Sequence, residues 1–218
     1  MKISLPDITL IAVTSIKIPE TVLALRKSSL FIDFGAVKLV SPVKPHNFPE
    51  DIQFEYSTDI TCIDDYNLYV FRDLTHHVQT KFCLLIQYDS WVINPGVWDN
   101  KWLEYDYIGA PWIISPEAYI CHDTGEHVRV GNGGFSLRSK KLLEIPRLHN
   151  MELLQEQGWY NEDGNICVYH RKQMLDLGIV YAPVNVAARF SYERPMPENF
   201  GVRPFGFHKN LPSEVLPC

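Results

Sequence analysis

Continuous apolar runs and helix-spaced apolar positions alternate along the chain, and this pattern predicts an α/β fold. The runs Thr9–Ser15, Ala36–Val40 and Phe82–Gln87 lack the alternation of half-exposed strands, which is typical of strands covered on both faces. A helix over Pro19–Leu30 lies between the first two runs, because proline followed by an acid suits a first helical turn. Strand, helix and strand in this order form a right-handed βαβ unit. We therefore expect a mostly parallel central sheet flanked by helices.

Further elements have shorter or less regular patterns. They are a half-exposed strand at 52–56, helices over 63–78, 139–143 and 161–177, and strands at 179–182 and 186–190. With 218 residues and 46% apolar content, the chain has enough apolar material for a sizeable core. We expect a single domain over residues 1–218.

Charge and cysteine content narrow the possible function classes. The net charge of −6 argues against a broad nucleic-acid surface. No stretch approaches the roughly 20 apolar residues that span a bilayer, and the N-terminus lacks a long apolar core. The five cysteines are odd in number and form no C-x-x-C pair, which favours reduced thiols. We therefore expect a soluble, cytoplasmic protein with no transmembrane segment.

Polar side chains follow two of the buried runs. Asp89 comes just after Phe82–Gln87, where open α/β sheets bind their ligands, and Thr14 and Ser15 end the first run. Carboxyl ends of parallel strands share one sheet edge, so these residues are candidate nucleotide contacts. Taken alone, Asp89 is more typical of a turn residue.

A glycine-rich loop and an acidic helix start follow later. Gly131-Asn132-Gly133-Gly134 permits close backbone approach, but neither G-x-G-x-x-G nor a P-loop occurs, which disfavours dinucleotide oxidoreductases and P-loop kinases. Taken alone, Glu162 and Asp163 after Asn161 are ordinary first-turn acids. A lone histidine near the C-terminus, here His208, is usually structural.

Tryptophans and tyrosines are dense between Trp91 and Trp112, in a segment rich in loop residues. Two interpretations stay open: a satellite core beneath long loops, or a platform on which the apolar faces of sugar rings stack.

The order of these motifs resembles that of a GT-A-type glycosyltransferase, and more closely a poorly characterised microbial family of glycosyltransferase-like proteins. The strings are Gln87-Tyr88-Asp89, DYIGAPW at 106–112, GNGGFSLRS at 131–139 and Asn161-Glu162-Asp163. The resemblance covers roughly Thr9 to His208. It implies a GT-A-like fold and transfer of a sugar from a nucleoside diphosphate sugar, with UDP-sugar favoured, to a hydroxyl of a glycan or other acceptor.

The resemblance also implies roles for individual residues. Asp89 and His208 would hold Mn²⁺ or Mg²⁺ against the donor diphosphate, and Asp163, or alternatively Glu162, would take the acceptor proton in an inverting reaction. The implied donor contacts are Thr14, Ser15, Gln87, Tyr88, Asp89, Gly133, Gly134 and Arg138, and the acceptor contacts are Asp106, Trp91, Trp112 and Phe135.

One position departs from the D-x-D pattern of GT-A enzymes. Gln87 stands where the first aspartate is usual, which removes one negative charge from the metal site. The departure keeps a second interpretation open, a non-catalytic sugar- or nucleotide-binding module with a decayed site. A sugar-nucleotide nucleotidyltransferase is a third, but it requires a glycine-rich basic loop after the first strand, and Ser15–Glu20 has no glycine and only Lys17.

Overall fold

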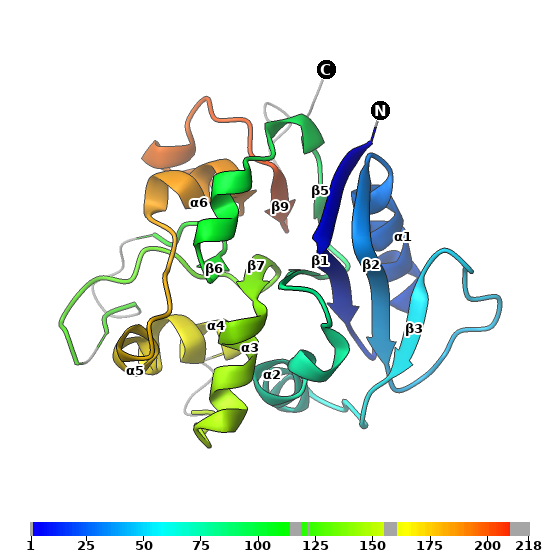
Figure 1. Ribbon diagram of the computed structural model, residues 1–218, viewed down its shortest axis with the longest axis horizontal. Helices are drawn as coiled ribbons and strands as arrows, with labels where there is room; N and C mark the ends of the chain where they lie inside the picture. The colour runs from blue at the N-terminus through cyan, green and yellow to red at the C-terminus, as the bar shows by residue number, and fades with distance from the viewer. Residues whose placement is uncertain (1, 114–118, 122, 155–160, 210–218) are drawn as a thin grey trace.

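The central sheet has six strands in the order β3-β2-β1-β4-β7-β6 (Figure 1). The structure, a computed structural model, describes residues 2–113, 119–121, 123–154 and 161–209. The strands are β1 (Ile3–Val13), β2 (Ile32–Ser41), β3 (Gln53–Tyr56), β4 (Phe82–Ile86), β6 (Tyr107–Ile108) and β7 (Phe135–Ser139). Strands β3, β2, β1 and β4 pair in parallel, and β7 pairs antiparallel with both β4 and β6. The expectation of an α/β fold with a mostly parallel sheet is confirmed.

Helices cover both faces of this sheet. They are α1 (Ile18–Ser29), α2 (Ile63–Arg72), α3 (Lys140–Leu148), α4 (Glu162–Gly164), α5 (Arg171–Asp176) and α6 (Val184–Phe190), with a π-helical turn η5 (Asn165–Tyr169) and 3-10 turns η1 (Leu74–His77), η2 (Pro95–Val97), η3 (Asn100–Glu104) and η6 (Pro197–Asn199). Leu84 of β4 packs in the core that α1 and α6 close, whereas its neighbour Leu85 packs in the core of α2 and α3. Because both faces of β4 are buried, its sequence is apolar without alternation.

A second sheet of three short strands brings the C-terminal part of the chain to the end of β4. Its order is β5 (Ser90–Val92), β9 (Gly206–His208) and β8 (Ser191–Tyr192). Strands β5 and β9 are antiparallel, with Ser90 opposite His208. Since β5 begins directly after the Gln87–Asp89 segment, this pairing places His208 beside that segment.

The expected strands at 179–182 and 186–190 are wrong. In the first, Tyr181 makes only an isolated bridge to Tyr107, and the second lies in helix α6. A short apolar run does not distinguish a strand from a buried helix, and here Pro183 precedes a helix that buries Ala187 and Phe190. The helix expected at 139–143 begins as expected but extends to Leu148.

None of the helices in the described part of the chain has the length and apolar character needed to cross a bilayer. Cys62, Cys83, Cys121 and Cys167 are free thiols, and Cys218 lies outside the described residues.

A charged network connects β2, β3 and η1. Lys38 is buried, and its Nζ donates to Glu55 Oε1 at 2.5 Å and to Gln79 Oε1 at 2.7 Å. The other carboxylate oxygen of Glu55 bonds to the His77 ring. Burial raises the pKa of Glu55, but the hydrogen bonds and charges of Lys38 and His77 together lower it below its usual value. The carboxylate of Glu55 is therefore stabilised in its charged form by folding.

This network predicts an acid-dependent loss of stability. Because the folded-state pKa of Glu55 is the lower one, the unfolded chain binds the proton first, and the stabilisation is present above the usual value of 4.5 and is lost as the pH falls below it. In urea unfolding, wild type should be more stable than Glu55→Gln at neutral pH, and the difference should shrink toward about pH 3. The exposed Glu50→Gln should match wild type throughout. A stability difference between wild type and Glu55→Gln that stays the same at low pH would contradict the stabilising role of the Glu55 carboxylate.

Candidate active site

Two adjoining pockets lie at the carboxyl ends of the parallel strands. The first, here called the apolar pocket, has a volume of about 280 Å³. The second, the polar pocket, has a volume of about 400 Å³. Both are lined by Ile63, Tyr66 and Gln87, so the pockets meet at the start of α2 and the end of β4.

The apolar pocket collects four of the expected donor contacts. Thr14 and Ser15 follow β1, Gln87 and Tyr88 follow β4, and all four line this pocket. The Thr14 hydroxyl is engaged within its own loop, since it donates to the Ile16 carbonyl at 2.5 Å and accepts from the Ile16 amide at 3.1 Å. The loop after β1 is thus held by a local turn.

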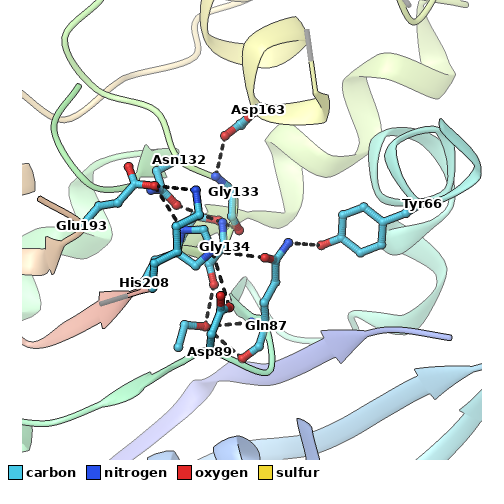
Figure 2. A network of polar contacts seen from close by, with 12 residues as sticks. Tyr66, Gln87, Asp89, Asn132, Gly133, Gly134, Asp163, Glu193 and His208 are labelled. Atoms are coloured by element: carbon cyan, nitrogen blue, oxygen red, sulfur yellow. Dashed lines mark hydrogen bonds and ion pairs between the residues drawn. The ribbon is translucent and has the colours of Figure 1, made fainter. Parts of the chain in front are cut away.

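Tyr66 and Gln87 form the ridge between the two pockets. Gln87 Nε2 donates to the Tyr66 hydroxyl at 3.0 Å (Figure 2). Burial, followed by the nearby charge of Glu162, raises the pKa of Tyr66 above its usual value, so this hydroxyl stays protonated.

Asp163 borders the polar pocket at the start of α4. Its Oδ2 accepts from the Gly133 amide at 2.7 Å, and its Oδ1 accepts from the Gly164 amide at 2.8 Å. The carboxylate is oriented by backbone groups on both oxygens and borders the space that a ligand would enter.

His208 lies on the other side of the glycine-rich loop (Figure 2). A Cβ atom at Gly134 would overlap the His208 imidazole, so only glycine permits this approach. His208 Nε2 lies 3.2 Å from Gln87 Oε1 and 3.6 Å from Asp89 Oδ1. Asp89 Oδ1 is buried and makes no hydrogen bond within the described structure.

Glu193 holds the opposite side of the His208 ring. Its Oε1 lies 3.5 Å from His208 Nδ1 and 3.0 Å from Lys209 Nζ. Burial raises the pKa of Glu193, but the hydrogen bonds and charges of His208 and Lys209 outweigh this and lower it to about 2. On the other side of the ring, His208 Nε2 donates to Gln87 Oε1, because an amide oxygen only accepts, and lies 3.6 Å from Asp89 Oδ1. The imidazole is thus held between Glu193 on one side and Gln87 and Asp89 on the other.

Glu162 and Arg138 do not have the positions expected of them. Arg138 is fully buried on β7, and its Nη2 donates to Glu162 Oε1 at 3.0 Å. Burial raises the pKa of Glu162, whereas the Arg138 charge lowers it. A Cβ atom at Gly133 would overlap the Glu162 carboxylate, so this glycine makes room for the ion pair. Arg138 is thus a core residue, and its expected phosphate contact is wrong.

Three of the expected acceptor contacts lie away from both pockets. Phe135 is fully buried among core aromatic side chains that include Phe190. Asp106 accepts from the Ser139 hydroxyl at 2.5 Å and from the Val180 amide, which fixes the loop before β6. Trp91 packs under Lys27 Nζ, 3.7 Å from the ring centroid. The role of each is structural, and the acceptor assignments are corrected accordingly.

Trp112 does line the polar pocket, as expected. Its ring stacks on Tyr119 with centroids 4.2 Å apart and planes inclined by 18°. A Cβ atom at Gly131 would overlap this indole, so the first glycine of the loop also permits a close side-chain approach. The satellite-core interpretation thus holds for Trp102, which is buried, while the sugar platform stays a prediction for Trp112 at the pocket.

The donor atoms beside His208 suit a divalent cation that accepts oxygen and nitrogen. Asp89 Oδ1 is a buried carboxylate oxygen without a hydrogen-bond donor, and His208 Nε2 lies 3.6 Å from it and 3.2 Å from Gln87 Oε1. Mn²⁺ accepts carboxylate, carbonyl and imidazole ligands. In the residues that the structure describes, no three His, Cys, Asp or Glu side chains group to hold a metal ion, so the set requires oxygens from a ligand to be complete.

The sequence pattern does not single out several residues that the structure brings to the site, notably Tyr66, Asn67, Tyr119 and Glu193. Asn67 is 3% exposed on α2, donates to Asn161 Oδ1 and accepts from the Glu162 amide, both at 3.3 Å. It therefore positions the helix start that carries Asp163. A polar residue within an apolar helix face is the one signal that could have identified it. Glu193 has no local signal.

The family model of DUF5672, described as a protein of unknown function, matches residues 46–208 of the chain. This description gives no activity, so the glycosyltransferase resemblance of the motifs stays a prediction. The comparison with curated proteins gives no match.

Three solved structures are similar to the chain. A glycosyltransferase involved in the glycosylation of the major capsid of PBCV-1 is 13% identical, with 92% of this chain and 91% of that chain covered and a TM-score of 0.48. The mannosyltransferase PcManGT from Pyrobaculum calidifontis, in complex with GDP-Man and Mn²⁺, is also 13% identical, with 81% and 55% covered and a TM-score of 0.48. The bifunctional IspDF from Campylobacter jejuni is 12% identical, with 80% and 48% covered and a TM-score of 0.45. The chain thus spans about half the length of the last two, and at this similarity the function has to be argued from the site itself.

The ion pair predicts that the two neighbouring acids, Glu162 and Asp163, contribute differently to the stability of the fold. Glu162→Gln should lower the free energy of unfolding by about 3–5 kcal/mol, because it leaves the Arg138 charge buried without a partner. Asp163→Asn should cost far less, since the amide oxygen can still accept from the Gly133 amide. Urea unfolding of both variants checks this. A Glu162→Gln variant as stable as wild type would contradict the structural role.

Proposed function

The chain belongs to the DUF5672 family, and we propose that it transfers a sugar from a nucleoside diphosphate sugar to a hydroxyl of a glycan or other acceptor. One observation carries this proposal. Two adjacent glycines hold a carboxylate and a cation-binding group on opposite sides, since the Gly133 amide bonds to Asp163 and Gly134 packs on His208. Inverting glycosyl transfer uses such a separation of a base from the group that stabilises the leaving diphosphate.

The apolar pocket is the proposed site of the nucleoside, with UDP favoured. Its lining at the carboxyl ends of β1 and β4 is where open α/β sheets bind nucleotides, and Tyr88 offers an aromatic ring there. Tyr66 and Gln87 border both pockets, so a donor whose nucleoside occupies the apolar pocket would extend its diphosphate past them. The sugar would then lie in the polar pocket.

Asp89, Gln87 and His208 are the residues that would hold Mn²⁺. Gln87 and His208 line the polar pocket, and Asp89, which lines neither pocket, lies next to His208. Mn²⁺ bound there would supply charge neutralisation of the diphosphate as it leaves. Glu193 contacts this set through His208, since its Oε1 lies 3.5 Å from Nδ1, and binding of Mn²⁺ would require Nε2 to give up the proton that it donates to Gln87. Gln87 contributes a neutral oxygen in place of the usual carboxylate, so tight binding depends on the diphosphate charge.

Asp163 is the proposed base. Its carboxylate is oriented by backbone hydrogen bonds to both oxygens and borders the polar pocket. As the acceptor hydroxyl attacks the anomeric carbon, its proton passes to Asp163, the new C–O bond forms, and the bond to the diphosphate breaks. A base on the face opposite the leaving group gives inversion at the anomeric carbon. The stacked rings of Trp112 and Tyr119 provide an apolar wall for the acceptor sugar.

Asp163→Asn should lower transfer by about 10²- to 10⁴-fold, the usual contribution of a general base, and leave donor binding unchanged. Single-turnover transfer measured beside donor titration separates the two effects. Asp64→Asn, an exposed acid on α2, serves as the control. Transfer at the wild-type rate in Asp163→Asn would assign the base to another residue.

A donor should reveal itself by raising the unfolding temperature, because a ligand that binds only the native state stabilises it by mass action. We expect one member of a UDP-, GDP-, dTDP- and CMP-sugar panel to do so with Mn²⁺, and the rise to be lost with chelator or in Asp89→Asn. The exposed Asp176→Asn should behave as wild type. A rise that is independent of metal would favour the non-catalytic nucleotide-binding module, and no rise with any donor would contradict the proposed function.

A further inference from the structure

The loop between β8 and β9 presents an apolar side chain to solvent. Phe200 is 91% exposed, the highest exposure of any large apolar side chain in the described part of the chain. The loop lies at the periphery of the molecule after α6, in orange-red (Figure 1). A phenylalanine with so large an exposed fraction requires an explanation, because it buries almost no apolar surface when the chain folds.

The exposure of Phe200 results from an ordered turn. Asn199 Oδ1 accepts from the Met196 amide at 2.9 Å, and its Nδ2 donates to the Arg194 carbonyl at 2.8 Å. Gly201 has φ of +70°, the left-handed conformation that reverses the chain directly after Phe200. These contacts fix the turn with Phe200 at its apex.

The same segment is locally basic in a chain of net charge −6. Both of its acids are paired, Glu193 with Lys209 at 3.0 Å and Glu198 with Arg129 at 2.6 Å. The remaining cations are Arg189, Arg194 and Arg203, which are exposed and make no ion pair with another described residue. Arg194 and Arg203 of this loop and Arg189 at the end of helix α6 therefore offer unpaired positive charge on the chain before and after Phe200.

We propose that this surface, Phe200 with Arg189, Arg194 and Arg203, docks the protein on an anionic lipid bilayer. An aromatic side chain at the apex of a turn enters the headgroup region, and neighbouring arginines pair with anionic headgroups. A single protruding side chain suits insertion between lipids better than a protein interface, which buries about 800 Å² on each partner. Arg194 also lines the polar pocket, so docking brings the pocket mouth beside the lipid surface. This inference does not depend on the proposed transfer reaction.

The test is co-sedimentation of the full chain with vesicles, without nucleotide or metal. Wild type should pellet with vesicles of phosphatidylglycerol and phosphatidylcholine but not with phosphatidylcholine alone, and added salt should weaken binding. Arg203→Gln should lower the partition coefficient about fivefold, the value expected for one interfacial charge. Phe200→Ser should also lower it. The controls are Phe31→Ser, which removes another exposed phenylalanine, and Arg147→Gln at the end of α3, and both should bind as wild type.

Insertion is checked separately by Phe200→Trp, whose added fluorescence should shift to shorter wavelength with anionic vesicles and not with soluble heparin. Urea unfolding of each variant confirms that it is folded. Absence of binding to anionic vesicles overturns the proposal, as does binding that Phe200→Ser leaves unchanged. Equal binding of wild type and Phe200→Ser to heparin, with no fluorescence shift on vesicles, would identify a polyanion partner instead and also overturn it.

Discussion

The buried ion pair between Arg138 and Glu162 is the interaction on which the rest of the site depends. It links β7 in the sheet to the start of α4, at 3.0 Å and with both side chains almost fully excluded from solvent. Such a pair requires close geometry on all sides, because an unpaired charge in this position is costly. Gly133 has no side chain to obstruct Glu162, and the next acid, Asp163, is thereby placed where it accepts from the Gly133 amide. The position of the proposed base is thus a consequence of a structural contact.

The second constraint is the pairing of β5 with β9. It brings a histidine from the end of the chain against the segment that follows β4, where Gly134 leaves room for the ring. Asp89 and Gln87 on one side and Glu193 on the other then set the ring orientation. The glycine-rich loop therefore makes space for protein side chains on both sides, and its backbone amides are engaged by Asp163 and Asn132.

The polar pocket and the loop that carries Phe200 differ in the charge of their side chains. In the polar pocket, Glu193 pairs with Lys209 and His208, and Glu162 pairs with the buried Arg138. A divalent cation bound together with the diphosphate would add positive charge to this lining, which is the electrostatic argument for a metal-assisted donor site. The loop that carries Phe200 has the opposite character, since its acids are neutralised and its arginines are not. The two regions meet at Arg194.

Sequence alone determined the parts of the structure whose signal is local. Continuous apolar strands such as β4, the Pro-Glu start of α1 and the polar residues at strand ends follow from patterning, and they place Thr14, Gln87 and Tyr88 at one edge. Sequence did not distinguish the functional acid from the structural one in the Glu162-Asp163 pair, nor recognise Arg138 and Phe135 as core. Whether a side chain faces the pocket or the core depends on contacts between residues far apart in the chain, such as Glu162 with Arg138 and His208 with Gly134. Only the tertiary structure decides these contacts, because burial and pairing are properties of the packed chain.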